Sequence, residues 1–462
     1  MVVPSTPRTA VRRSTIERLE ARSLFSAAYS FDPVAFINAP TGGTAGDTFS
    51  INYGFEPAGI NSTGTVGFAA YINNASGNPQ GEGVYFAADH QITQFIRQGD
   101  PTPAGETYGG FGSFSPGSIN DNGDVAIGFG RPTSSPTVEV NSGIFEYVAS
   151  TGKVIAPIVP FKTAVPKGGV FQGVGFHASI NDAGAIAFAG TVKANIGPGA
   201  SIGLGEGVYT VDKSGHVTDV ASPGDAAPGG VFDYAFNPSI NNNGTVAFGA
   251  HIKGEPIISV GDPFPAFVSA AESVYVKYSH SGAIVSVAHQ GAAIPRSAGG
   301  GIYDLAFAPV VNDADQVLFV GCIRTKGITD PTQDPRGVFL YTGGKTVAVA
   351  RPGTAMPGGG TFASASFQPD NYDINDHGDV VFNATLTNGQ EGIYGWHNGS
   401  LTLIAKTGTV IPGIGTINTL DFEGAGFPSS GAFNNIHGQV LFGATLKQGG
   451  GVLLVASPTG NG

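Results

Sequence analysis

The chain has 462 residues and a formal net charge of −12, with 41% hydrophobic and only 12% charged residues. An acidic chain with so few clustered lysines and arginines is a poor partner for the phosphate backbone, which excludes a nucleic-acid-binding protein. Its single cysteine, Cys322, excludes an intramolecular disulfide, and no apolar run approaches the ~18 residues of a transmembrane helix. Many glycines (72) and prolines (31) separate short runs rich in Val, Ile, Phe and Tyr, which is typical of an all-β protein.

Residues 1–30 differ from the rest of the chain. They carry five arginines against two glutamates and lack the roughly 7–15-residue apolar core of a conventional signal peptide. The run Leu19-Glu-Ala-Arg-Ser-Leu-Phe-Ser-Ala27 resembles the Leu-Glu-Pro-Arg-x-Leu-Leu-Ser-Ala element that opens many large exported proteins of planctomycetes, with Ala21 replacing Pro and Phe25 replacing Leu. The resemblance implies that residues 1–30 are a targeting or disordered segment of an exported protein; a random polar tail is the alternative.

The rest of the chain repeats the pattern Asn-x-x-Gly at intervals of about sixty residues, which marks a repeat architecture. Asn and Asp side chains bond their own backbone two residues on, and Gly accepts positive φ, so we expect a type I turn that ends in a left-handed Gly. The fifth copy has Asp315 in place of Gly, and Asp tolerates the left-handed region. The predicted turn residues are Asn61, Gly64, Asn120, Gly123, Asn181, Gly184, Asn241, Gly244, Asn312, Asn375, Gly378, Asn435 and Gly438.

Each repeat has room for four strands. The clearest copy predicts strands at 207–211, 217–221, 232–240 and 245–250, with the Asn241 turn before the last of them. A large apolar residue seven positions after each Asn, usually Phe, is expected to pack between neighbouring sheets. A Gly-Val/Ile-Tyr/Phe run, as at Gly207-Val-Tyr209, marks the next strand.

Four-stranded units of this size are the blades of β-propellers, and the ends of the chain indicate a closed ring. After Gly438 only two strands remain, 439–446 and 451–456, so we expect two N-terminal strands, 33–39 and 48–60, to complete the seventh blade. The strand order resembles TolB-like propeller repeats, which implies that each turn links the outer strand of one blade to the inner strand of the next. Over residues 31–462 the chain more closely resembles bacterial tandem-repeat proteins of the Asn-x-x-Gly-x-x-Ala-Phe type. The predicted fold is therefore a seven-bladed propeller spanning residues 31–462.

Candidate chemistry is sparse. Asp121, Asn122 and Asp124 look like half of a Ca²⁺ loop but lack the distant bidentate Glu, so turn formation explains them equally well. The long insertion around 254–271 offers Pro263, Phe264 and Phe267 as an exposed binding loop, with packing against a neighbouring blade as the alternative. No Gly-x-Ser-x-Gly elbow or phosphate loop is present.

The sequence favours an exported or cell-surface, monomeric, non-catalytic module without a cofactor, which recognises a protein or polysaccharide. The alternative is a hydrolase or lyase that acts on extracellular polysaccharide through carboxylates at the channel mouth. Three or more acidic, Arg or Tyr side chains converging at one mouth would favour the enzyme.

Overall fold

The computed structural model describes residues 29–50, 54–101, 103, 107–108, 114–131, 140–154, 159–160, 163–197, 200–256, 273–330, 333–366, 371–420 and 431–459. The predicted binding loop with Pro263, Phe264 and Phe267 lies outside these residues, as does the N-terminal segment up to residue 28. The first strand begins at Tyr29, two residues before the predicted start of the folded body.

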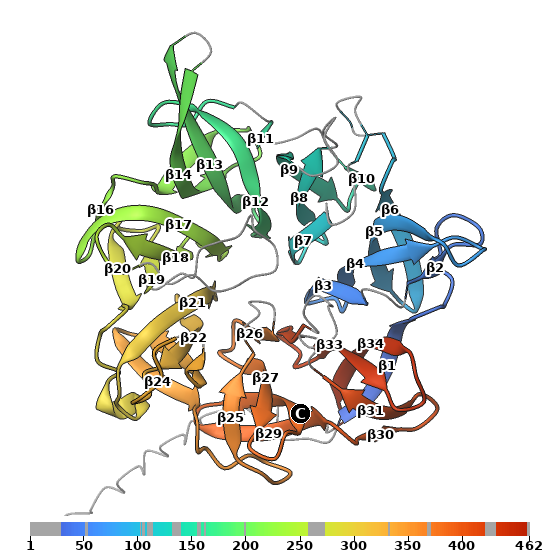
Figure 1. Cartoon of the computed structure of the whole chain (residues 1–462). Coiled ribbons are helices and arrows are strands. Elements are labelled where there is room, and N and C mark those ends of the chain that lie inside the picture. The colour runs from blue at the N-terminus through green and yellow to red at the C-terminus, as the bar shows by residue number, and fades with distance from the viewer. Residues whose placement is uncertain are drawn as a thin grey trace, which may run out of the picture.

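The described residues form a seven-bladed β-propeller, as predicted. Seven antiparallel sheets follow one another around a central channel, and the first and last parts of the chain meet in one sheet (Figure 1). Apart from a short 3₁₀ turn, η2 (Arg296–Ala298), the regular structure of the described residues is all β. No helix among these residues is long and apolar enough to cross a membrane.

The first four blades take up the N-terminal half of the ring. Blade 1 contains β2 (Thr48–Phe49), β3 (Phe55–Ile60), β4 (Val66–Asn73), β5 (Pro79–Ala88) and β6 (Gln91–Arg97). Blade 2 contains β7 (Phe114–Ile119), β8 (Val125–Arg131), β9 (Val140–Val148), β10 (Lys153–Val154) and β11 (Val159–Pro160). Blade 3 contains β12 (Val170–Ile180), β13 (Ile186–Gly197), β14 (Ala200–Val211) and β15 (Val217–Ala221). Blade 4 contains β16 (Ala226–Ala227), β17 (Gly230–Ile240), β18 (Val246–Ile252), β19 (Ser273–Lys277) and β20 (Ile284–Ala288).

The last three blades complete the ring. Blade 5 contains β21 (Tyr303–Val311), β22 (Val317–Ile323), β23 (Arg336–Thr342) and β24 (Lys345–Ala350). Blade 6 contains β25 (Phe362–Ala365), β26 (Tyr372–Ile374), β27 (Val380–Leu386), β28 (Glu391–His397) and β29 (Ser400–Lys406). Blade 7 contains β30 (Val410–Ile411), β31 (Gly415–Thr419), β32 (Phe433–Asn434), β33 (Val440–Leu446), β34 (Gly451–Pro458) and β1 (Tyr29–Phe36).

The predicted composition of the closing blade was wrong in detail. The N-terminal part contributes one strand, because β1 pairs antiparallel with β34 from Tyr29↔Pro458 to Phe36↔Val452. The next two segments, β2 and β3, pair with β4 and belong to blade 1. The C-terminal part supplies the remaining strands of blade 7, because β31 and β32 both pair with β33.

The position of the repeated turn also differs from the TolB-like expectation. Each Asn-x-x-Gly turn joins the innermost strand of a blade to the second strand of the same blade, as between β12 and β13, where Ile180 pairs with Ile186. The expected link from an outer strand to the next blade is therefore wrong. The hairpin explains the short turn, since antiparallel neighbours need only a tight connection.

The core lies between the blades rather than within them. The second strands are buried on both faces, as in β22 and β27, because each blade is covered on both sides by its neighbours. The predicted apolar positions, Phe68, Ile127, Phe188, Phe248, Phe319, Phe382 and Phe442, all have 0% exposure. At the closure, Phe68 and Tyr85 of blade 1 share a core cluster with Leu441 and Leu453 of blade 7. Apolar packing thus continues around the whole ring.

Candidate functional site

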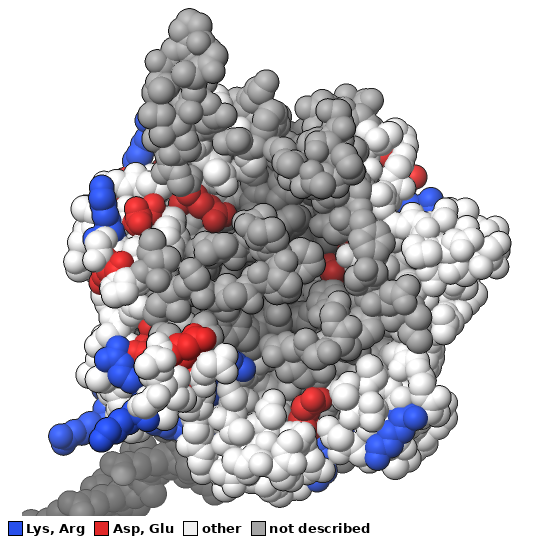
Figure 2. Space-filling model, in the orientation of Figure 1, with Lys and Arg blue, Asp and Glu red and all other residues white. Residues whose placement is uncertain are grey.

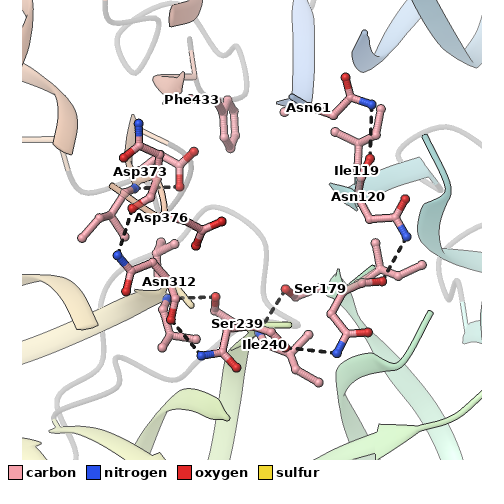
Figure 3. A pocket seen from close by; sticks show the side chains of 18 of the residues that line it. Asn61, Ile119, Asn120, Ser179, Ser239, Ile240, Asn312, Asp373, Asp376 and Phe433 are labelled. Atoms are coloured by element: carbon pink, nitrogen blue, oxygen red, sulfur yellow. Dashed lines mark hydrogen bonds between the residues drawn. The ribbon is translucent and has the colours of Figure 1, made fainter. Parts of the chain in front are cut away.

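A central cavity of about 280 Å³ is lined by residues from all seven blades. They come from the ends of the innermost strands, β3, β7, β12, β17, β21, β26 and β32, and from the Asn-x-x-Gly turns that follow them. Figure 3 shows these side chains around the cavity, with Asp373 and Asp376 on the side opposite Asn61 and Asn120. The repeated turn therefore forms one mouth of the channel.

The seven turn asparagines form a closed ring of hydrogen bonds between the blades. In each blade the Asn side-chain N–H donates to the backbone carbonyl of the Asn in the next blade. The donor–acceptor distances range from 2.8 Å between Asn241 and Asn312 to 3.2 Å between Asn61 and Asn120. The last bond, from Asn435 back to Asn61, is 2.9 Å long and closes the ring (dashed lines in Figure 3 mark several of its members). All seven asparagines are 3–6% exposed.

The ring explains why these positions hold Asn. The Asn61 Oδ1 accepts the N–H groups of Thr63 and Thr65, which builds the turn. In two outer turns, Asn74 between β4 and β5 and Asp212 between β14 and β15 build the same turn with the same two acceptor contacts. Asp and Asn build this turn equally well, but an ionised Asp has no N–H to donate. Only the bond to the next blade therefore requires the amide.

A second layer of bonds runs between the residues that follow the asparagines. The N–H groups of Ser62, Asp121, Asp182, Asn242 and Asp313 each donate to the Oδ1 of the corresponding Asp or Asn in the next blade, over 2.7–2.8 Å. The side-chain amide of Asn242 also reaches the Oδ2 atoms of Asp182 and Asp313, at 2.8 and 3.0 Å. Four aspartates, Asp121, Asp182, Asp313 and Asp376, are thereby held around one channel mouth.

A third set of bonds, found in three blades, starts two residues before the Asn. In blades 3 and 4, the Ser179 and Ser239 hydroxyls accept an N–H of the next blade at 3.1 Å. In blade 6 the same place is taken by Asp373, whose Oδ2 accepts the N–H of Asn434 at 3.1 Å. Burial raises the pKa of Asp373 to about 7, although the N–H groups of Asn434 and Ile374 favour its charged form.

The layers are interrupted in blade 7. Phe433 stands where blades 3 and 4 have Ser, and Ile436 stands where five blades have Asp or Asn. The side of the channel between blades 6 and 7 therefore combines two carboxylates, Asp373 and Asp376, with two apolar side chains.

The channel mouth is electrostatically one-sided. Among the described residues that line the cavity there are five aspartates and no Lys, Arg or His. Burial, together with the charges of Asp313, Asp121 and Asp182, raises the pKa of Asp376 above its usual range. On the face shown in Figure 2, lysines and arginines lie mainly toward the outer edge of the disc. The carboxylates of the mouth thus repel one another, and none of the described lining residues is a cation.

The predicted half-loop for Ca²⁺ is not brought together. Asp121 accepts the N–H of Ser62, Asn122 donates to the carbonyl of Asp182, and Asp124 accepts the N–H of Ala149. The three side chains serve three different contacts. Within the described residues no group of three His, Cys, Asp or Glu side chains is placed to hold a metal ion.

The sequence pattern did not predict that Asp182, Asp313, Asp373 and Asp376 belong to one site. A signal was available, since the position after the repeated Asn is Asp or Asn in five of seven copies. Turn chemistry alone does not require this. The recurrence of Asp or Asn at this position was a sign of contacts between the repeats.

Comparisons with known proteins give a partial match to one family model and solved structures that are similar in fold. A model of a family of unknown function (DUF7453) matches residues 268–453. No match was found among curated proteins. Among solved structures, the chain is similar to the β-propeller domain of the Trilobed protease from Pyrococcus furiosus, at 10% identity and a TM-score of 0.43, over 88% of this chain and 96% of that one.

Two further structures are similar over most of this chain. For the Pyrococcus horikoshii acylaminoacyl peptidase the identity is 9% and the TM-score 0.44, over 89% of this chain and 53% of the peptidase, about half of its length. For the polysaccharide lyase Uly1 the identity is 8% and the TM-score 0.39, over 96% of this chain and 94% of the lyase. At these identities the similarity concerns the fold alone.

Proposed function

We propose that this chain is an exported, non-catalytic recognition module, and that its acidic channel mouth receives a positively charged side chain of a protein partner. The observation that carries the proposal is the set of five aspartates around a cavity of about 280 Å³ without a lining cation among the described residues. The Lys and Arg side chains have the complementary charge, and desolvated charge complementarity gives specificity and fast association. The exported location rests on the N-terminal element of residues 19–27.

The chemistry of the mouth favours a basic protein segment over a neutral polysaccharide. The Oδ1 atoms of Asp121 and Asp376 accept hydrogen bonds from backbone N–H groups, so both carboxylates are fixed in place. Hydroxyl groups of a neutral sugar would leave the mutual repulsion of these carboxylates uncompensated. A guanidinium or ammonium group relieves it, and Phe433 offers an apolar surface for the aliphatic part of such a side chain.

The test is a binding measurement with Lys- and Arg-containing peptides at low and high salt. The key variant is Asp121→Asn with Asp313→Asn and Asp376→Asn, because Asn242 shows that this layer accepts Asn and its Oδ1. We expect the variant to lose at least about tenfold in affinity, and wild-type binding to weaken with salt. The control is Asp212→Asn in the outer turn after β14. Asn74 makes the same contacts in the outer turn after β4, so this kind of turn accepts Asn. Equal binding by the triple variant and the wild type would refute the proposal.

Polysaccharide cleavage is the second candidate. It is favoured by the convergence of acids at one mouth and by the pKa of about 7 at Asp373, beside Asp376. A carboxyl group that is protonated near neutral pH can act as a general acid while a second carboxylate stays ionised. Release of reducing or unsaturated ends from a polysaccharide panel, abolished by Asp373→Ser, would establish this candidate in place of recognition.

A further inference from the structure

Blade 4 carries a cluster of two histidines and two carboxylates that the channel does not use. Strands β17 and β18 meet at the Asn turn through Ile240↔Val246 and reach their other ends at Phe232↔Ile252. The cluster lies at this second end, away from the acidic mouth: Asp233 on β17, His251 on β18, Glu255 just after β18 and His289 just after β20 (blade 4 in Figure 1).

His251 is 1% exposed and stacks on Tyr234, with ring centroids 5.0 Å apart. Its Nε2 lies 3.2 Å from the backbone carbonyl oxygen of Glu255. A carbonyl can only accept, so Nε2 carries a proton. The other nitrogen, Nδ1, lies 3.4 Å from the Oδ2 of Asp233. In neutral His251 a lone pair would therefore face a carboxylate.

His289 repeats this arrangement with the nitrogens exchanged. Its Nδ1 lies 2.8 Å from the carbonyl oxygen of Gln290 and carries the proton, and its Nε2 lies 3.2 Å from the Oε1 of Glu255. All four ring nitrogens of the two histidines thus lie within 3.4 Å of an oxygen atom, two of them at carboxylates. Only the imidazolium form has two N–H groups to offer them.

Unsatisfied polar atoms concentrate at this place. Five buried atoms among the described residues lack a hydrogen-bond partner here: His251 Nδ1, His289 Nε2, Glu255 Oε2, Gln290 Oε1 and the Tyr275 hydroxyl. Buried polar groups are normally paired, and a proton bound to either ring would add a donor to this cluster. Because the described residues contain no set of three ligands placed for a metal ion, the proton is the better candidate.

We propose that His251 and His289 form a proton-operated clasp, which in its protonated state ties Asp233 and Glu255 to the two rings and fastens the chain where it leaves β18. Deprotonation of the imidazoles leaves two carboxylates facing lone pairs and releases this segment. Among the described residues, Tyr275 is a further titratable group that interacts with Glu255, and the exposed Lys253 lies two residues before Glu255 in the chain. Burial, followed by the charge of Glu255, raises the pKa of Tyr275, so its hydroxyl stays neutral throughout the range in which histidine titrates.

Hydrogen exchange of the full chain tests the clasp. Protection of the backbone amides in a peptide covering 246–256, corrected for intrinsic exchange, is expected to fall about tenfold between pH 6 and pH 8, because the contacts of both rings with the carboxylates are lost. In His289→Gln and in Asp233→Asn, both at partly exposed positions, the fall in protection between pH 6 and pH 8 is expected to stay below about twofold. His216→Gln, at an exposed histidine in the outer turn of blade 3, serves as the matched control and should behave as wild type.

Protection of a peptide covering 312–323 in blade 5 verifies that each variant is folded. A tenfold loss that persists in both His289→Gln and Asp233→Asn would overturn the proposal, as would protection independent of pH in the wild type. Zn²⁺ added at pH 8 provides the last comparison. If it restored protection in the wild type and not in His289→Gln, a metal ion rather than a proton would close the cluster, which also overturns the proposal.

Discussion

Asn435 is the residue at which the ring of asparagines closes between the last and the first blade. Its Nδ2 donates to the carbonyl of Asn61 at 2.9 Å and to the Oε1 of Gln439 at 2.8 Å, and its Oδ1 accepts the N–H groups of His437 and Gln439. Asn435→Asp has the same shape and keeps both acceptor contacts of the turn. It removes the donors and places a carboxylate oxygen against the Asn61 carbonyl.

The expected loss follows from these contacts. The amide of Gln439 can turn its N–H group toward the new carboxylate, so that contact is recoverable. The bond to Asn61 is lost, at about 1 kcal/mol, and a charge 4% exposed is left facing a carbonyl, at about 2 kcal/mol more. We therefore expect Asn435→Asp to lower the free energy of unfolding by about 3 kcal/mol near pH 7. Below pH 4 the loss should shrink, because a protonated carboxyl group can again donate to Asn61.

Urea unfolding followed by the fluorescence of Trp396, the only tryptophan and 8% exposed, measures this change. Asn74→Asp is the matched control, because Asn74 makes the same turn contacts in an exposed turn that Asp212 already forms with Asp. Its stability should change by less than about 0.5 kcal/mol. If Asn435→Asp and Asn74→Asp lost equally little, the ring bond would not contribute and the repeated Asn would serve the turn alone.

Four other changes test the remaining parts of the fold. Gly244→Ala should cost about 1 kcal/mol in urea unfolding, because φ is +80° while the nearest atom to the new Cβ, in Ser279, is 3.7 Å away. Phe248→Ala should cost about 4 kcal/mol, since the ring has 0% exposure and shares a core cluster with Val208 of blade 3; a loss below about 1 kcal/mol would contradict the inter-blade core. Folding raises the pKa of Asp373 from 3.8 to about 7, so the contribution of its protonated form to stability is fully present below pH 4 and is lost as the pH rises through 7. Between pH 5 and pH 8 the wild type should therefore lose about 2 kcal/mol of unfolding free energy relative to Asp373→Ser, and parallel stability curves would refute this. Cys322 is fully buried and burial raises the pKa of its thiol to about 12, so a thiol reagent should label it only as fast as the protein unfolds; rapid labelling without denaturant would contradict its position.

Local chemistry was readable from the sequence alone. The Asn-x-x-Gly spacing predicted a turn, and the structure has Gly at φ between +71° and +81° in six copies and Asp315 at +55° in the fifth copy. The period and the Phe positions predicted blades that pack face to face, because an apolar residue that recurs with the repeat must meet the same surroundings in each copy. These properties depend on residues close together in the chain.

Contacts between residues about sixty positions apart were decided only by the tertiary structure. Both the TolB-like position of the turn and the expected share of N-terminal strands in blade 7 were wrong, because strand pairing, as of β1 with β34, is not encoded in any local pattern. The choice of Asn over Asp could not be understood from the turn, which Asp212 forms equally well. It depends on a carbonyl oxygen in the next blade, and the same closure gathers Asp121, Asp182, Asp313 and Asp376 around one cavity.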